Sequence, residues 1–413
     1  MSLFFYHIAL FLYQAAVRLV APFNTKARLW VEGRKGIWEK LGKAIGEKDK
    51  WIWMHCSSLG EFEQGRPVLE QLRKQYPNHR LLLSFFSPSG YEQRKNYPGA
   101  DLVTYLPLDG PANARRFLDL VKPEKVFFVK YDYWFYYLKG CHDRQIPLYI
   151  FSAIFRPAQP FFKWYGGLHR QMLGFFTRLF VQDKASFDLL EKHIPGLPVS
   201  IAGDTRFDRV VEIAEGSVVP AIVQAFSDGH TVLVAGSTWP ADEAVLSDAL
   251  SHFPEIKCVI APHEISDKHL TELEDLLPST IRYSRYTEGT SARVLIIDNI
   301  GMLSSLYRVA TVSYIGGGFG SGIHNTLEAA VYGVPVLFGP NYQRFREAVE
   351  LVKCGAGFVV KNKEEMKQVL DGLFNDEQAR KVAAQQASEY VKMGRGATEG
   401  ILGGWRSGMA DEG

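Results

Sequence analysis

The sequence predicts an α/β protein made of two consecutive domains, each a parallel sheet covered by helices on both faces. The chain has 413 residues, which suits two domains of ~150–200 residues better than a single core. From residue 51 onward, short apolar runs alternate with segments of helical periodicity, as in doubly wound α/β units. A second series begins near Thr231, so we expect two facing Rossmann-like domains with ligands in an interdomain cleft, at the carboxyl ends of the strands.

Each series is expected to supply a sheet of short apolar strands with helices between them. The first-series strands are expected at residues 51–57, 80–86, 101–106, 125–130, 147–152, 179–182 and 199–202. The second-series strands are expected at residues 231–236, 258–262, 281–283, 294–297, 312–316, 334–338 and 357–360. Helices are expected from a tight turn at 58–60 through residue 73, and at 113–121, 186–193, 241–252, 301–309, 325–332, 345–354 and 363–374.

The predicted domain organisation has four parts. They are an N-terminal segment 1–30, a first domain 31–205, a second domain 206–395 and a flexible glycine-rich tail 396–413, with a hinge zone at 203–230. The sequence leaves open whether the helical stretch after Glu377 packs back onto the first domain.

Composition excludes several classes of protein. At 46% hydrophobic and 22% charged residues, the chain is typical of an ordinary folded protein. A formal net charge of +2 does not indicate a polyanion partner for the whole chain. The four cysteines are far apart and lack metal-ligand spacing, which fits a reducing compartment and argues against a disulfide framework.

The N-terminal segment is unusually apolar. Residues 3–17 contain only His7 and Gln14 as polar interruptions, and the run is shorter than the ~20 residues of a spanning helix. No basic n-region or small-residue cleavage site suggests a removed signal peptide. Basic residues follow at Arg18, Lys26, Arg28, Arg34, Lys35, Lys40 and Lys43. This pattern favours a membrane-associated helix facing an anionic leaflet; the alternative is a helix buried against its own domain.

The first candidate for chemistry is Ser57-Ser58-Leu59-Gly60-Glu61, after the first strand of the first domain. Gly60 permits a tight turn or the close approach of a ligand to the backbone. Glu61 at a helix start has two interpretations: it stabilises the helix dipole, or it acts as a general base toward an acceptor hydroxyl.

The second candidate is the glycine-rich segment from Ile315 to Glu328. Its glycines follow a strand and precede a helix, so backbone N–H groups can face a phosphate. The segment is not a GxxxxGK[ST] loop, which disfavours an ATP triphosphate. A nucleotide-sugar donor fits, with Glu328 accepting hydrogen bonds from ribose hydroxyls; the alternative is a plain strand–helix turn.

Further segments at predicted strand ends of the second domain are candidates for the same nucleotide site. They are 236–238, 262–264 and 298–301. His263 alone is more often a structural histidine than a ligand contact. At the hinge, Arg206 is placed either to bind a phosphate or to pair with a neighbouring aspartate.

Taken together and in order, these segments resemble the family of 3-deoxy-D-manno-octulosonic acid (Kdo) transferases. The resemblance runs from the apolar N-terminal segment to at least residue 360, and only the ordered combination of motifs is specific. The matching segments are Gly33-Arg34-Lys35, Ser58 to Glu61 with Arg66-Pro67, Gly203 with Phe207-Asp208, Gly236-Ser237-Thr238, His324 to Ala330 and Val334 to Pro340.

The resemblance implies a GT-B fold and an activity. That activity is the inverting, metal-independent transfer of Kdo from CMP-Kdo to a lipid A precursor, in lipopolysaccharide core biosynthesis. The first domain would take the acceptor and the second the donor. No cofactor, metal or nucleic acid is expected. The implied partners are CMP-Kdo, the lipid A precursor and the membrane surface, at the cytoplasmic face of the inner membrane of a Gram-negative bacterium.

The resemblance also implies roles for individual residues. Glu61 matches the family's proton acceptor, and Arg206 falls where the family has a lysine that stabilises the transition state. Ser58, Gly60 and Arg66 fall on the acceptor side. The positions expected to bind the donor are Ser237, Thr238, Pro262, His263, Ile300, Gly301, Met302, Gly317, Gly318, Asn325, Thr326, Leu327 and Glu328.

The sequence departs from the family pattern at several positions. The family's Glu-Thr-Glu-x-Trp-Pro segment reads 130–135 Lys-Tyr-Asp-Tyr-Trp-Phe here, so Lys130 replaces a transition-state glutamate. We hypothesise that Asp132 takes over part of that role or that Lys130 contacts the Kdo carboxylate. Separate assays of Lys130→Ala and Asp132→Ala test these hypotheses, and full activity would exclude the corresponding one. The family's Pro-Arg-His also lacks its arginine at Pro262-His263, and its Glu after the Asp-x-x-Gly turn is Met302.

Two alternatives stay open at the level of sequence. One is another GT-B glycosyltransferase with a different nucleotide sugar, such as a UDP-linked one. The other is a non-catalytic nucleotide-sugar-binding membrane protein, against which Glu61 beside Gly60 argues.

Overall fold

The structure is a computed structural model that describes residues 3–410, with side chains described through Gly404. The chain divides into two compact units. Unit 1 comprises Met1–Arg209 and Arg395–Gly413, and unit 2 comprises Val210–Gly394. The boundary lies close to the predicted one at 205/206.

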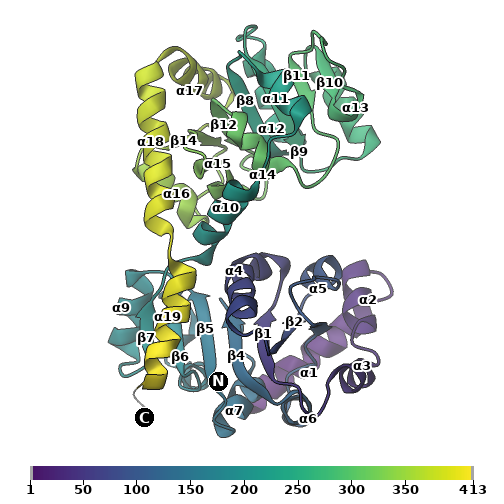
Figure 1. Ribbon diagram of the computed structural model, residues 1–413, viewed down its shortest axis with the longest axis vertical. Coiled ribbons are helices and arrows are strands. Elements are labelled where there is room, and N and C mark those ends of the chain that lie inside the picture. The colour runs from purple at the N-terminus through teal and green to yellow at the C-terminus, as the bar shows by residue number, and fades with distance from the viewer. Residues whose placement is uncertain (1–2, 411–413) are drawn as a thin grey trace. The chain divides into compact units, whose positions relative to one another are not determined.

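Unit 1 contains a parallel seven-stranded sheet in the order β3-β2-β1-β4-β5-β6-β7 (Figure 1). Its strands are β1 Trp51–Cys56, β2 Arg80–Phe85, β3 Leu102–Tyr105, β4 Pro123–Val129, β5 Leu148–Ala153, β6 Arg178–Val181 and β7 Val199–Ile201. β1 pairs with β2 on one side and with β4 on the other. The carboxyl ends of β1 and β4 therefore mark the point where the strand order reverses, which is where ligands bind in such sheets.

Helices cover both faces of this sheet. They are α1 Leu3–Val20, α2 Thr25–Glu32, α3 Ile37–Ala44, α4 Leu59–Gln75, α5 Pro88–Arg94, α6 Pro111–Val121, α7 Phe135–Asp143, α8 Gly167–Leu173, α9 Lys184–His193 and α19 Ala397–Ala410, while α10 Thr205–Gly216 crosses the unit boundary. Successive residues of β1 point to opposite faces, so Trp53 enters one core and Met54 the other. A strand buried on both faces is a continuous apolar run, which explains why the sequence predicted it.

Unit 2 repeats the architecture with a parallel sheet in the order β10-β11-β9-β8-β12-β13-β14. Its strands are β8 Val232–Thr238, β9 Lys257–Pro262, β10 Thr280–Arg282, β11 Val294–Ile296, β12 Val312–Ile315, β13 Val336–Phe338 and β14 Gly357–Val359. Its further helices are α11 Ala221–Ser227, α12 Pro240–Leu250, α13 Asp267–Leu276, α14 Leu303–Leu306, α15 Leu327–Ala330, α16 Arg346–Lys353, α17 Lys363–Asn375 and α18 Glu377–Gly394. The predicted pair of Rossmann-like α/β domains is confirmed, and here the strand order reverses between β8 and β12.

The expectation of a flexible tail from residue 396 is wrong for the part of the tail that the structure describes. Residues from Ala397 onward form α19, and Ile401 and Leu402 are buried in the unit 1 core. The carboxylate of Asp208 accepts hydrogen bonds from the backbone N–H groups of Gly396 and Thr398, both at 2.7 Å. It is α19 that returns to unit 1, because α18 belongs to unit 2; residues 411–413 lie outside the described part.

The N-terminal helix α1 has one side that packs on its own unit and one side that is exposed. One side packs on unit 1, where the Tyr6 phenol is buried and donates a 2.5 Å hydrogen bond to Asp109. The other side exposes large apolar side chains, with Phe4 66%, Phe11 69% and Leu19 77% accessible. By length and a mean hydropathy of 1.6, α1 is also apolar enough to cross a membrane, a property that a signal sequence or a core helix shares.

Candidate active site

A pair of carboxyl groups lies at the carboxyl ends of β1 and β4. Glu61 is in the first turn of α4, directly after β1, and one of its carboxylate oxygens accepts a 2.5 Å hydrogen bond from the Ser57 backbone N–H. Asp132 follows β4 and is buried, and its Oδ1 atom accepts a hydrogen bond from the Ser57 hydroxyl. The two carboxyl groups lie close enough for each to affect the ionisation of the other. Two strand ends thus bring together residues that are far apart in the sequence.

Burial governs the protonation of this pair. It raises the pKa of Asp132 well above its ordinary value, and the neighbouring charge of Glu61 raises it further. Burial also raises the pKa of Glu61, although the Ser57 N–H and the positive charge of Lys130 oppose the shift. One proton shared by two close carboxyl groups is the expected state. We therefore assign the proton to Asp132 and the charge to Glu61, which makes Glu61 the candidate base.

Cationic side chains lie around the carboxyl pair. Lys130 directly follows β4 with a backbone φ of 65°, a left-handed conformation that is rare for a residue other than glycine. Its positive charge acts on both Glu61 and Asp204. Arg206 binds the buried Asp204 through Nε and a terminal nitrogen, at 2.9 and 2.8 Å. The aspartate pairing that the sequence allowed for Arg206 is therefore present, and it fixes the guanidinium in one orientation.

The conformation expected for Gly60 is wrong. Residues 58–60 were predicted to form a tight turn, but Ser58 is the N-cap residue of α4 and Gly60 lies in its first helical turn. Gly60 has no positive φ, because the helix begins directly at the strand end. A Cβ atom at Gly60 would meet no other atom within 4 Å, so this glycine leaves open space beside Glu61.

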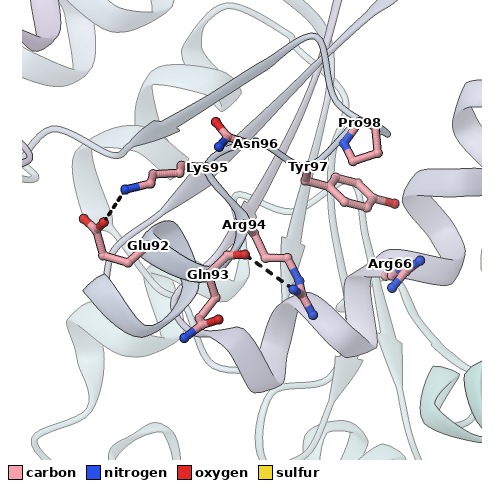
Figure 2. A pocket seen from close by; sticks show the side chains of 8 residues that line it. All are labelled: Arg66, Glu92, Gln93, Arg94, Lys95, Asn96, Tyr97 and Pro98. Carbon is pink, nitrogen blue, oxygen red and sulfur yellow. Dashed lines mark hydrogen bonds and ion pairs between the residues drawn. The ribbon is translucent and has the colours of Figure 1, made fainter. Parts of the chain in front are cut away.

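Arg66, predicted on the acceptor side, lines a cavity of about 310 Å³ together with the segment Glu92 to Pro98 (Figure 2). Every cation in this wall has a carboxylate partner. The pairs are Arg66 with Glu70 at 2.7 Å, Arg94 with Glu63 at 2.8 Å and Lys95 with Glu92 at 2.9 Å. The charges of the cavity are thus compensated internally, and the acceptor-side role of Arg66 stays a prediction.

In unit 2, the glycine-rich segment after β12 is held by a buried aspartate. Oδ2 of Asp242 accepts a 2.8 Å hydrogen bond from the Gly317 backbone N–H, and Oδ1 accepts one from the Tyr314 hydroxyl. Gly317 has a φ of 91°, and a Cβ atom at Gly318 would lie 2.5 Å from the backbone nitrogen of Gly339. Both glycines are therefore required by the fold of the loop.

Three aromatic rings stack at the carboxyl ends of β8, β9 and β12. The ring of His263 lies 4.5 Å from Trp239 and 4.7 Å from His324, measured between centroids, and both pairs are nearly parallel. The indole N–H of Trp239 donates to Nε2 of His324 at 3.3 Å. His263 thus belongs to an exposed ring stack at the point where the strand order reverses.

The other predicted donor-binding residues gather around the same strand ends but differ in what they offer. Ser237 and Pro262 lie in the last residues of β8 and β9, and the side chain of Ile300 is 87% exposed before Gly301 and Met302. Asn325 donates a 3.0 Å hydrogen bond to Glu328. The side chains of Thr238, Thr326 and Leu327 are fully buried, and Thr238 bonds the buried Glu243. These three residues have only backbone groups to offer a ligand.

No group of three or more His, Cys, Asp or Glu side chains in the described part of the chain is arranged to hold a metal ion. Independence from metals nevertheless stays a prediction of the family resemblance.

Comparison with known proteins shows what the chain is similar to. The family model described as 3-deoxy-D-manno-octulosonic-acid transferase matches residues 34–209. The 3-deoxy-D-manno-octulosonic acid transferase of Aquifex aeolicus is 26% identical over 365 residues, covering 83% of this chain and 90% of that protein. The same enzyme of Chlamydia muridarum is 25% identical over 355 residues, covering 83% and 82%. Over most of its length, this chain is therefore similar to Kdo transferases. It is a glycosyltransferase.

Solved structures confirm the predicted fold class. A putative UDP-N-acetylglucosamine 2-epimerase from Listeria monocytogenes aligns with a TM-score of 0.62 at 16% identity, over 88% of this chain and 97% of that one. UDP-GlcNAc 2-epimerase from Neisseria meningitidis aligns with a TM-score of 0.61 at 17% identity, over 85% and 98%. At this identity the similarity concerns the fold alone, which is GT-B.

Two residues of the candidate sites were not predicted from the sequence. His55 lies inside β1, and the apolar run around it predicts an ordinary core residue. In the structure its ring faces Asp132. Trp239 follows β8 directly, and its position after a predicted strand beside Gly236-Ser237-Thr238 was the available signal.

Proposed function

We propose that this protein transfers Kdo from CMP-Kdo to a lipid A precursor, with inversion at the anomeric carbon and without a metal. The observation that carries the proposal is the pair formed by the half-buried Glu61 and the buried Asp132 at the switch point of unit 1. A base of raised pKa, held ready by hydrogen bonds, suits the removal of a proton from a sugar hydroxyl near neutral pH. The comparison with named Kdo transferases over more than four fifths of the chain supports the choice of sugar.

The proposed reaction is a single displacement. The acceptor hydroxyl oxygen attacks the anomeric carbon of Kdo while its proton passes to the Glu61 carboxylate. The bond between that carbon and the CMP phosphate oxygen breaks, and CMP departs with the bonding electrons. Asp132 donates its hydrogen bond to Glu61 before the transfer and shares the pair's two protons afterwards. Arg206 and Lys130 supply positive charge for the negative charge that develops on the leaving group or lies on the Kdo carboxylate.

Donor binding is proposed for the strand ends of unit 2. The Gly317 amide is held by Asp242, so the phosphate contact is proposed for the neighbouring Gly318 amide. The exposed rings of Trp239 and His263, stacked with the half-buried His324, offer flat surfaces to a nucleotide. Backbone groups of 300–302 and 325–328 complete the proposed contacts. The absence of a GxxxxGK[ST] loop suits a nucleoside monophosphate sugar better than a triphosphate.

The proposed location is the cytoplasmic face of the inner membrane in a Gram-negative bacterium. The exposed apolar side of α1 supports membrane attachment, and the docked side supports a helix that lies along the membrane surface. The attached protein would then meet the acylated acceptor in the membrane in which the acceptor resides.

The deciding experiment is mass spectrometry of lipid A precursor incubated with the purified protein and freshly generated CMP-Kdo. The wild type is expected to add Kdo, and Glu61→Gln is expected to lose about 10²–10⁴-fold in rate. Glu63→Gln is the matched control, because Glu63 lies on the same helix but pairs with Arg94. Equal loss in both variants, or no Kdo added by the wild type, would contradict the proposal.

Ligand-induced thermal stabilisation distinguishes a CMP-linked donor from a UDP-linked one. CMP is expected to raise the Tm of the protein and UDP is not. A selective effect of UDP would favour a different nucleotide-sugar transferase and would leave the fold assignment intact.

A further inference from the structure

A second cavity of unit 1 differs from the one beside Arg66 in its charge. It has a volume of about 370 Å³ and lies between α1, α2, α3 and the segment after β3. Its wall contains three cationic residues, Arg18, Arg34 and Lys35, and no aspartate or glutamate. Trp30 and Trp38 supply its aromatic part. The cavity therefore combines uncompensated positive charge with apolar surface.

Arg34 is a cation without an anionic partner in the described part of the chain. Its guanidinium donates to the backbone carbonyls of Leu106 at 3.1 Å, Trp30 at 3.1 Å and Phe86 at 2.8 Å. Its charge lies over the Trp30 ring at 4.0 Å, and burial lowers its pKa to about 10. Carbonyl oxygens hold the guanidinium in place without neutralising it, and N–H groups remain for a further acceptor. A buried charge of this kind calls for a counter-ion.

Trp30 adds a second unsatisfied donor. Its side chain is 5% exposed, and the indole N–H meets no hydrogen-bond acceptor among the described residues. A buried donor that is left unpaired destabilises the folded protein, so an acceptor at this position would be favourable. Since the indole nitrogen only donates, a ligand that satisfies it must present an acceptor oxygen.

The position of the cavity indicates where such a ligand comes from. Gln14 and Arg18 of its wall belong to α1, and Arg18 lies along the same side of this helix as the exposed Phe4 and Phe11, at spacings of seven residues. A membrane that receives these side chains brings its headgroups to the level of the cavity. Tryptophan is enriched at that level, and clusters of basic residues there recognise anionic lipids.

We propose that this cavity binds the phosphate headgroup of an acidic membrane phospholipid, with its glycerol and upper acyl carbons against Trp30 and Trp38. Arg18 and Lys35 approach the phosphate from the rim, and Arg34 and the Trp30 indole from the interior. The site adds to the proposed transferase activity and rests only on its membrane attachment. Its occupancy would order α1 to α3 against the sheet and place the chain at acidic membrane.

The test uses the full chain and a soluble probe, dihexanoyl phosphatidylglycerol below its micelle concentration. Tryptophan fluorescence is expected to change saturably with this lipid and not with dihexanoyl phosphatidylcholine. The double variant Arg18→Gln/Lys35→Gln is expected to bind at least about tenfold more weakly, because it loses two charged contacts. No CMP-Kdo is present, so the result is independent of the transfer reaction.

The matched control is Lys26→Gln/Arg28→Gln, which removes the same charge from α2 without touching the cavity wall. Its affinity is expected to stay within about twofold of the wild type. Equal loss in both double variants would overturn the site in favour of diffuse surface attraction. Equal binding of phosphatidylcholine would also overturn it, as would competitive displacement of the probe by lipid A precursor, which would make the cavity part of the acceptor site. Circular dichroism of each variant establishes that it is folded.

Discussion

Nε2 of His55 lies 3.3 Å from Oδ2 of Asp132, beneath the carboxyl pair. His55 is fully buried, its Nε2 accepts the indole N–H of Trp134 at 3.2 Å, and burial lowers its pKa to about 3. The ring is therefore uncharged at neutral pH and brings no positive charge to Asp132. Nothing on this side favours ionised Asp132, so His55 is a positioning residue that keeps the proton on Asp132.

Replacement of Asp132 distinguishes a protonated from a charged role. Asp132→Asn keeps an acceptor for Ser57 and a donor for Glu61, so it is expected to retain activity within about tenfold of the wild type. Asp132→Ala removes the donor that lowers the pKa of Glu61, so the acidic limb of its kcat/KM profile is expected to move to higher pH. Near-complete loss in the Asn variant would show that Asp132 acts as an anion.

The same pair makes stability depend on pH. The folded pKa of Asp132 is raised above its unfolded value of ~3.9, so the folded state binds more protons above that pH. The free energy of unfolding is therefore expected to fall as pH rises above about 4, by at most about 1.4 kcal/mol per pH unit for this group. Asp132→Asn removes this contribution, while Glu61 keeps a smaller one of the same sign. Urea unfolding of the wild type and of Asp132→Asn between pH 4 and 8 measures this contribution. Parallel pH profiles of the two proteins would contradict the raised pKa of Asp132.

Gly60→Ala is expected to separate stability from activity. Alanine fits the helical backbone and enters open space, so the variant is expected to gain up to about 1 kcal/mol of stability. The same methyl group occupies the space beside Glu61, so kcat/KM for the acceptor is expected to fall about tenfold. Gly372→Ala in α17 is the control, because its Cβ also meets open space, far along the chain from the carboxyl pair. Full activity in Gly60→Ala would mean that the acceptor does not approach this face of α4.

The sequence predicted the strands of both sheets well because parallel buried strands are unbroken apolar runs between turn residues. It also placed Glu61 at the start of the helix that follows the first strand, although this helix begins at Leu59 and not after a turn at 58–60. It did not predict the docking of α19, because Ile401 and Leu402 are isolated apolar residues in a glycine-rich segment. Their partner Phe180 lies far earlier in the chain.

Contacts across a sheet are the other gap. The approach of His55 and Asp132 depends on the parallel pairing of β1 with β4, in which His55 lies opposite Phe128. No local sequence pattern predicts such a register. The ring stack of Trp239 depends in the same way on three strands that are separated in sequence.

Two glycines of the loop after β12 give a matched pair for donor binding. A Cβ atom at Gly318 would lie 2.5 Å from the backbone nitrogen of Gly339, whereas one at Gly320 would have its nearest neighbour at 3.6 Å. Gly318→Ala is expected to destabilise the protein by about 1–3 kcal/mol and to weaken CMP binding, because two backbones must separate. Gly320→Ala is expected to change stability by less than about 0.5 kcal/mol. Thermal unfolding and calorimetric titration with CMP measure both, and equal behaviour of the two variants would contradict the close packing.

If α1 attaches the protein to the membrane, its exposed apolar side chains should contribute to vesicle binding and not to the stability of the fold. Phe4 and Phe11 are 66% and 69% accessible, and neither belongs to the core of unit 1. The double variant Phe4→Ser/Phe11→Ser is therefore expected to keep its Tm and to lose at least about tenfold in partition to vesicles, since each buried aromatic side chain contributes roughly 1.5–3 kcal/mol. Tyr6→Phe is the contrasting change, because it breaks the buried hydrogen bond to Asp109 and leaves the exposed face intact. It is expected to lower Tm and to keep the affinity of the folded protein for vesicles. Vesicle flotation and thermal unfolding separate the two faces of the helix, and unchanged flotation of the double variant would show that another surface attaches the protein.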